Sequence, residues 1–163
     1  ALISTASPIM TEQGITSEFI TIVISIMGIF NGIGRLIFSA ISDKLRNRAN
    51  IYKVILLISI VVSIITVMLA DTITIPITLI VISACYGAGF SCLPSLLSDI
   101  FGMDNVSKIH GITLTAWGFA GLVGNQISGL IYSICSSYLP IFIVITVLYV
   151  IALVLSLLLV KKS

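Results

Sequence analysis

Charged and metal-binding residues are scarce in this sequence. Only 9% of its 163 residues are charged, whereas soluble domains contain about 25%. One histidine and three cysteines give no metal-binding spacing, and the chain has neither an H-E-x-x-H motif nor a pair of acids inside an apolar stretch. We therefore expect no enzymatic activity, no metal and no other cofactor. The net charge of +2 does not suggest a nucleic acid partner.

Long stretches without any charge are abundant. They cover residues 19–34, 54–70, 72–98 and 111–160. Because a helix of about 20 predominantly apolar residues crosses a bilayer, they predict an all-α, polytopic membrane protein. The five predicted spans are residues 17–42, 51–70, 75–98, 109–135 and 139–160. Residues 1–10 are apolar but too short to span, and we interpret them as the end of an earlier helix in a fragment of a longer chain.

Seven of the eight basic residues lie on one side of the predicted spans. They are Lys44, Arg46, Arg48, Lys53, Lys108, Lys161 and Lys162. Cytoplasmic loops carry an excess of Lys and Arg, so this distribution predicts a cytoplasmic C-terminus. We expect a multi-pass protein of the cell (plasma) membrane, in contact with the lipid bilayer. The eighth basic residue, Arg35, lies inside the first predicted span.

Glycine is unevenly distributed among the spans. The spans at 51–70 and 139–160 contain none, whereas the other three hold most of the twelve glycines. Small residues let helix backbones approach closely in lipid, so we expect the glycine-free spans to form a lipid-facing scaffold and the other three to make the close contacts. The glycines expected to pack between helices are Gly28, Gly32, Gly87, Gly118 and Gly121.

A polar stripe runs along the first span. Positions three and four residues apart lie on one helical face, and every position of this series is polar or glycine. The series is Glu18, Thr21, Ser25, Gly28, Gly32, Arg35, Ser39 and Ser42. It indicates either a face that contacts a ligand or a packing seam without ligand contact.

Three segments carry a resemblance to a known family. NGIGRLIFSAISD at 31–43, CYGAGFSCLPSLLSDIFG at 85–102 and IHGITLTAWGFAGLVG at 109–124 are similar to the oxalate/formate antiporter family of the major facilitator superfamily. SDKLRNR at 42–48 also resembles the superfamily signature between the eighth and ninth spans. The resemblance implies that residues 1–163 are the C-terminal half of a twelve-helix transporter. The five spans would be its eighth to twelfth and residues 1–10 the end of the seventh, and the missing N-terminal half of six helices would be its partner.

This resemblance implies secondary active transport of a small organic anion by alternating access. Transporter sites lie near the bilayer midplane, and the loop at 43–48 would belong to the cytoplasmic gate. The predicted gating residues are Asp43, Lys44, Arg46 and Arg48. In the family implied, the ninth and twelfth spans are peripheral, the seventh and tenth line the cavity, and the eighth and eleventh meet the other half.

Arg35 is the residue on which the functional hypothesis depends. It lies about 12 Å deeper in the bilayer than Asp43, where an arginine is costly and by default functional. Its planar guanidinium can donate two parallel hydrogen bonds to a carboxylate. Contact with substrate, a link to the missing half, and extension of the side chain toward the cytoplasmic surface all remain open.

The sequence departs from the family in the basic residues that are expected to bind the anion, and this departure bears on which anion is carried. Oxalate exchangers of this family are thought to use basic residues on both the eighth and eleventh spans, but no Lys or Arg occurs between Lys108 and Lys161. We therefore expect a monocarboxylate, with oxalate exchange or a non-transporting sensor of the same fold as the alternatives. The predicted substrate-binding residues are Arg35, Asn31, Tyr86, Trp117, Asn125 and Gln126.

Overall fold

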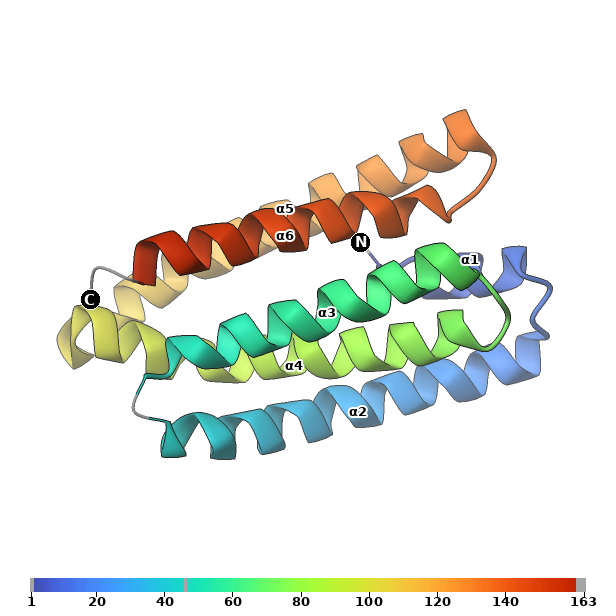
Figure 1. The fold of residues 1–163 in the computed structure, drawn as a ribbon. Coiled ribbons are helices and arrows are strands. Elements are labelled where there is room, and N and C mark those ends of the chain that lie inside the picture. The colour runs from blue at the N-terminus through green and yellow to red at the C-terminus, as the bar shows by residue number, and fades with distance from the viewer. Residues whose placement is uncertain (1, 46, 161–163) are drawn as a thin grey trace.

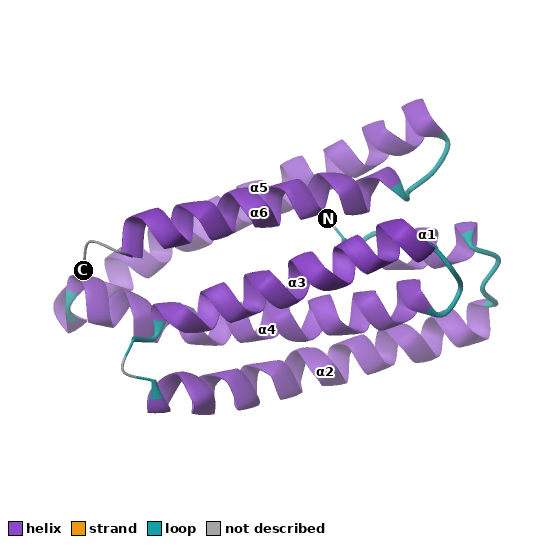
Figure 2. Cartoon of the chain, viewed as in Figure 1, coloured by secondary structure: helices purple, strands orange, loops and turns teal. Residues whose placement is uncertain are grey.

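The predicted all-α fold is confirmed. The computed structural model describes residues 2–45 and 47–160, and every regular element in these ranges is a helix (Figure 2). The elements are α1 (Ala6–Glu12), α2 (Ser17–Lys44), α3 (Ala49–Leu69), α4 (Thr74–Phe101), the 3-10 helix η1 (Met103–Asn105), α5 (Val106–Cys135) and α6 (Pro140–Val160). The five long helices lie side by side as an up-and-down bundle (Figure 1), and each begins and ends within about one helical turn of a predicted span.

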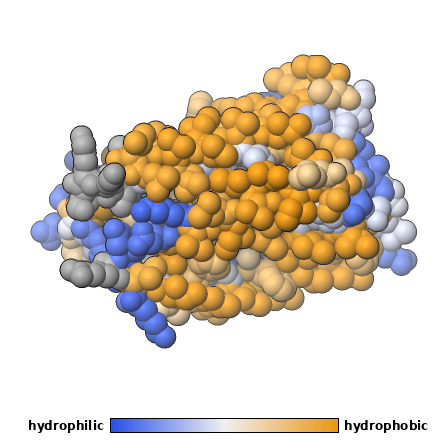
Figure 3. Space-filling view, viewed as in Figure 1, coloured by the Kyte–Doolittle hydropathy of each residue, from blue (hydrophilic) through white to orange (hydrophobic). Residues whose placement is uncertain are grey.

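Four of the long helices are long and apolar enough to cross a membrane. They are α2, α3, α4 and the segment Pro140–Leu158 of α6. α5 has the length, since its 30 residues extend about 45 Å, but its glycines together with Asn125 and Gln126 reduce its apolar character, and it is not among the four. The surface in Figure 3 is hydrophobic along most of the bundle and hydrophilic toward its ends, as expected for a protein surrounded by lipid.

The two ends of α4 are set by local backbone chemistry. At its start, the Asp71 carboxylate accepts hydrogen bonds from the backbone N–H groups of Ile73 (3.0 Å) and Thr74 (2.5 Å). At its end, Gly102 adopts a φ of 77°, which glycine tolerates without steric cost. α4 therefore forms one long helix that continues through Pro94 and contacts α2, α3 and α5.

The core is divided into two clusters. One joins α1, α2, α4 and the start of α6, and includes the buried side chains of Met10, Met27, Leu79 and Phe142. The other joins α3 to α4 through Ile51, Ile55, Cys85, Ala88 and Cys92. Two hydrogen bonds also join these two helices, because Tyr52 Oη donates to the Gly89 carbonyl (2.7 Å) and the Thr66 and Thr78 hydroxyls lie 2.6 Å apart. α3 also packs along α6, so the two glycine-free helices are neighbours.

Candidate functional site

The site is built on a close contact between α2 and α4. A Cβ placed on Gly34 would lie 2.2 Å from the carbonyl oxygen of Ala84, and one on Gly87 would lie 2.2 Å from that of Asn31. Neither distance is possible for a real side chain beside a backbone atom, so the two helices approach at positions where only glycine fits.

Three hydrogen bonds cross the same contact and fix its register. The Ser83 hydroxyl donates to the Met27 carbonyl (2.9 Å), and the Asn31 amide donates to the Ser83 carbonyl (3.1 Å). One turn further, the Ser91 hydroxyl donates to the carbonyl of Arg35 (3.2 Å). The backbone carbonyls of Met27 and Arg35 and the side chain of Asn31 are therefore held by α4.

The Arg35 side chain is oriented by two neighbours. Its Nε donates to Asn31 Oδ1 (3.2 Å), and its Cζ lies 5.6 Å from the centre of the Phe90 ring. The residue is exposed, and among the described residues no carboxylate forms a salt bridge with it and its two Nη groups donate no hydrogen bond. The outer part of the guanidinium is thus oriented but has no anionic partner within the described part of the chain.

An aromatic group continues the site from α4 to α5. Phe90 contacts Trp117 edge to face, with 5.6 Å between ring centres, and lies 6.4 Å from Tyr86. The Trp117 indole N–H donates to the Tyr86 hydroxyl (2.6 Å). Residues of α2, α4 and α5 that are far apart in the sequence therefore form one continuous cluster.

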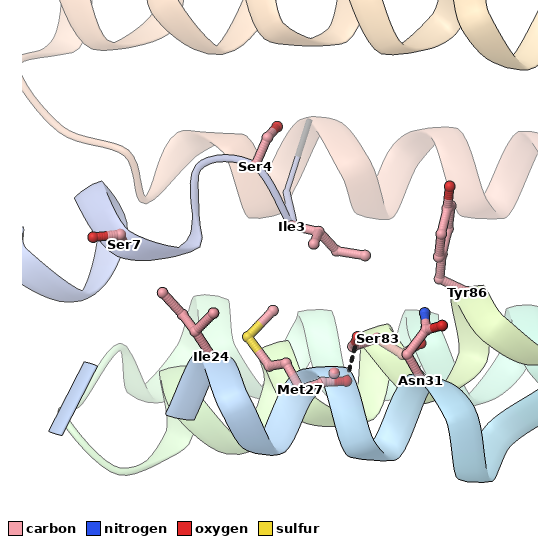
Figure 4. A pocket seen from close by; sticks show the side chains of 9 residues that line it. Ile3, Ser4, Ser7, Ile24, Met27, Asn31, Ser83 and Tyr86 are labelled. Atoms are coloured by element: carbon pink, nitrogen blue, oxygen red, sulfur yellow. Dashed lines mark hydrogen bonds between the residues drawn. The ribbon is translucent and has the colours of Figure 1, made fainter. Parts of the chain in front are cut away.

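A cavity of about 370 Å³ lies beside this cluster. Figure 4 shows its wall, to which α2 contributes Ile24, Met27 and Asn31, α4 contributes Ser83 and Tyr86, and the first residues of the chain contribute Ile3, Ser4 and Ser7. Gly28 also borders it, so this glycine adjoins open space and not another helix.

The six predicted substrate-binding residues do not all meet. Asn31 and Tyr86 border the cavity, Arg35 is bonded to Asn31, and Trp117 is bonded to Tyr86. Asn125 accepts a hydrogen bond from the Ser4 hydroxyl (2.6 Å). Gln126 is exposed and makes no polar contact among the described residues. The substrate-binding role of all six stays a prediction.

Two side chains of this site, those of Phe90 and Ser83, were not predicted from the sequence. Phe90 lies one helical turn after Tyr86, so helical spacing could have placed it on the same face. Ser83, which bonds to both Met27 and Asn31, is an ordinary serine in an apolar helix, and no sequence signal distinguishes it.

The packing role predicted for four of the glycines finds no contact in the described structure. A Cβ on Gly28, Gly32, Gly118 or Gly121 would meet no atom within 4 Å among the described residues. For Gly118 and Gly121 the reason is that α5 lies only loosely against its neighbours, with Ser128 as its one buried residue in the described chain. Gly87 lies at a close contact, and the packing role of the other four glycines stays a prediction.

Asp43 and Lys44 form the end of α2 and Arg48 immediately precedes α3, at a hydrophilic end of the bundle (Figure 3). Arg48 forms ion pairs with Asp99 of α4 (2.9 Å) and Asp43 (3.4 Å), and Asp99 was not predicted. Lys44 is exposed and has no ion pair among the described residues. Arg46 lies outside the described residues, and the gating role of this loop stays a prediction.

Comparison with known proteins agrees with an all-α membrane protein. The family model for the Major Facilitator Superfamily matches residues 1–163. No curated protein and no solved structure matches the chain significantly, and the narrower resemblance to oxalate/formate antiporters stays a prediction. Apolar helices in an all-α bundle together with this match over the whole chain show that the chain belongs to the Major Facilitator Superfamily of membrane transporters.

Proposed function

We propose that the chain is part of a secondary active transporter that carries a small organic anion, a monocarboxylate, by alternating access. The observation that supports this proposal is the environment of the Arg35 side chain. Its Nε is held by Asn31 and its ring neighbour is Phe90, while its Nη groups have no partner among the described residues. A carboxylate would satisfy both Nη groups through two parallel charge-assisted hydrogen bonds.

The cost of placing a charge in the bilayer favours a binding role over a purely structural one. An arginine at the centre of a membrane helix costs at least about 2.5 kcal/mol, and such residues mark substrate or ion pathways. The bond to Asn31 keeps the guanidinium on α2. We place the substrate beside this group and beside the cavity that Asn31 and Tyr86 border.

The choice of a monocarboxylate over a dicarboxylate rests on the number of cations. No Lys or Arg occurs from residue 109 to 160, so α5 offers Trp117, Asn125 and Gln126 as neutral groups. One guanidinium matches one carboxylate, and a second carboxylate would be taken out of water without a cation to balance it.

The charged end of the bundle would serve as the cytoplasmic gate. Arg48 bridges Asp43 and Asp99, which connects the loop after α2 to the end of α4. Exposed ion pairs of this kind are worth at most about 1 kcal/mol each, so they can form and break between conformations. The excess of Lys and Arg at this end would place it, with the C-terminus, on the cytoplasmic side of the cell membrane.

Uptake by the full-length protein in sealed proteoliposomes tests the proposal. We expect saturable uptake and counterflow of labelled formate, lactate or pyruvate, with weaker transport of oxalate. Preferred transport of oxalate would replace the monocarboxylate with a dicarboxylate. Correctly folded protein that moves no carboxylate would contradict the proposal and favour a sensor of the same fold.

A further inference from the structure

A second cavity lies on the other side of Tyr86. It has a volume of about 710 Å³ and lies between α3, α4, α5 and α6. Its apolar wall includes Ile55 and Leu56 of α3, Ile82 of α4, Leu122 of α5, and Ile145 and Leu148 of α6. It shares Ile3, Ser4 and Tyr86 with the smaller cavity, so these three residues separate the two spaces.

The lining of this cavity contains no charged side chain among the described residues. An ion enclosed entirely within it would lose its hydration without a compensating charge, so the chemistry of the wall favours a neutral ligand. The cavity is large enough for a drug-sized molecule, and its mostly apolar wall with a few polar groups is typical of small-molecule sites.

Its polar groups lie on the start of the chain and on α3, α4, α5 and α6. The Trp117 N–H is already used by Tyr86, and Asn125 Oδ1 already accepts from Ser4. The amide nitrogen of Asn125 and the hydroxyls of Tyr86 and Tyr149 donate no hydrogen bond to the described residues, so they remain as donors for a ligand. A matching ligand therefore carries a neutral hydrogen-bond acceptor, such as a carbonyl or ester oxygen, on an apolar body.

The cavity exists because α5 presents glycine to it. Gly118 and Gly121 line the space, and a Cβ on either would meet nothing within 4 Å. Large side chains at these positions would fill the cavity without displacing backbone.

We propose that this cavity binds a neutral, mainly apolar molecule with hydrogen-bond acceptors, at a site that adjoins that of the transported anion and shares Tyr86 with it. A lipid acyl chain with its ester and a free apolar small molecule share this chemistry. The proposal does not depend on which anion is carried, and it would survive a failure of the transport proposal.

Photolabelling of the full-length protein in lipid nanodiscs tests it. The probe is trifluoromethyl(iodophenyl)diazirine, a neutral apolar carbene precursor, and a second series uses a phospholipid with a diazirine in its acyl chain. The cavity-lining residues around Trp117 of α5 and Tyr149 of α6 are here called the cavity segment. We expect at least one probe to label the cavity segment more than the outward-facing residues of α6. Labelling by the free probe should be saturable.

Filling the cavity provides the matched comparison. Gly121→Phe should reduce labelling of the cavity segment about fivefold or more, because the ring occupies the space. Gly111→Phe should leave it unchanged, since Gly111 is also on α5 and in open space but lines neither cavity. Labelling of the cavity segment no higher than that of the outward-facing residues, or insensitive to Gly121→Phe, would overturn the proposal.

A measurement on unmodified protein covers the case in which Gly121→Phe fails to fold. Cys85 lines the cavity, so neutral N-ethylmaleimide should alkylate it more slowly when unlabelled iodobenzene is present in excess. Alkylation of exposed Cys135 is the internal reference. Equal slowing at both cysteines, or none at Cys85, would count against a cavity site.

Discussion

The α2–α4 contact and α5 use glycine in opposite ways. Gly34 and Gly87 each face a backbone carbonyl so closely that no Cβ fits. Gly111, Gly118 and Gly121 of α5 face open space. The same residue type therefore brings two helices together in one region and leaves room in the other.

The difference shows which part of the bundle is rigid. α2 and α4 are joined by glycine contacts and by three hydrogen bonds to backbone carbonyls, so the Arg35–Asn31 pair has a fixed base. α5 is attached to the rest through side chains, notably Trp117 on Tyr86 and Asn125 on Ser4. A helix held in this way can shift with less disturbance of the core.

The largest expected effect is on stability at the rigid contact. Gly34→Ala and Gly87→Ala would each force the α2 and α4 backbones apart, and we expect a loss of about 1–3 kcal/mol in the free energy of unfolding. The measurement is thermal or denaturant unfolding of the purified full-length protein in detergent.

Gly32→Ala is the matched control on the same helix. Its Cβ meets nothing within 4 Å, so the substitution should be neutral or stabilise by up to about 1 kcal/mol through helix propensity. Equal losses for Gly32→Ala and Gly34→Ala would contradict the comparison.

A smaller effect is expected where α5 is attached. Trp117→Phe keeps the ring contact with Phe90 but removes the hydrogen bond to Tyr86, which is worth about 0.5–1.5 kcal/mol. We expect faster amide exchange in α5 with little change in α2. Faster exchange throughout both helices would show that α5 is not a separately attached element.

The smallest effect concerns the start of α4. The pKa of the Asp71 carboxyl lies below its ordinary 3.8, because the backbone N–H of Thr74, with a further contribution from that of Ile73, stabilises the charged form. A lowered folded-state pKa adds stability that is complete above 3.8 and is lost as the pH falls through the folded pKa.

Asp71→Asn should therefore be slightly less stable than the unmodified protein near neutral pH, and the difference should shrink below about pH 4. Unfolding midpoints measured across this pH range give the comparison, with Asp104→Asn on η1 as a control for removing one negative charge. A difference that does not change with pH would show that the charge of Asp71 is not responsible.

The sequence predicted the helices better than their contacts. Charge-free stretches and a few turn residues were enough to place all five long helices, because the cost of burying charge in lipid is a local property. Contacts depend on which face meets which neighbour. The spacing of the glycines in α5 predicts a smooth helix face but does not identify which helix packs against it.

The functional site shows the same difference between residues that local sequence predicts and residues that depend on packing. Arg35 was found because an arginine in an apolar helix is conspicuous, and its link to Asn31 follows from a spacing of four residues. Gly34 at the closest contact and Asp99 beside Arg48 depend on the packing of α4, which no local pattern reveals, whereas the spacing from Tyr86 could have indicated Phe90.

Replacement of Arg35 by lysine tests the proposed function most directly. Lysine keeps the charge but lacks the planar fork, so we expect Arg35→Lys to lower kcat/KM for monocarboxylate uptake by about tenfold or more, while Lys53→Ala leaves it nearly unchanged. Both variants would be reconstituted as full-length protein at matched density. Equal uptake by Arg35→Lys, Lys53→Ala and the unmodified protein would remove Arg35 from the substrate site.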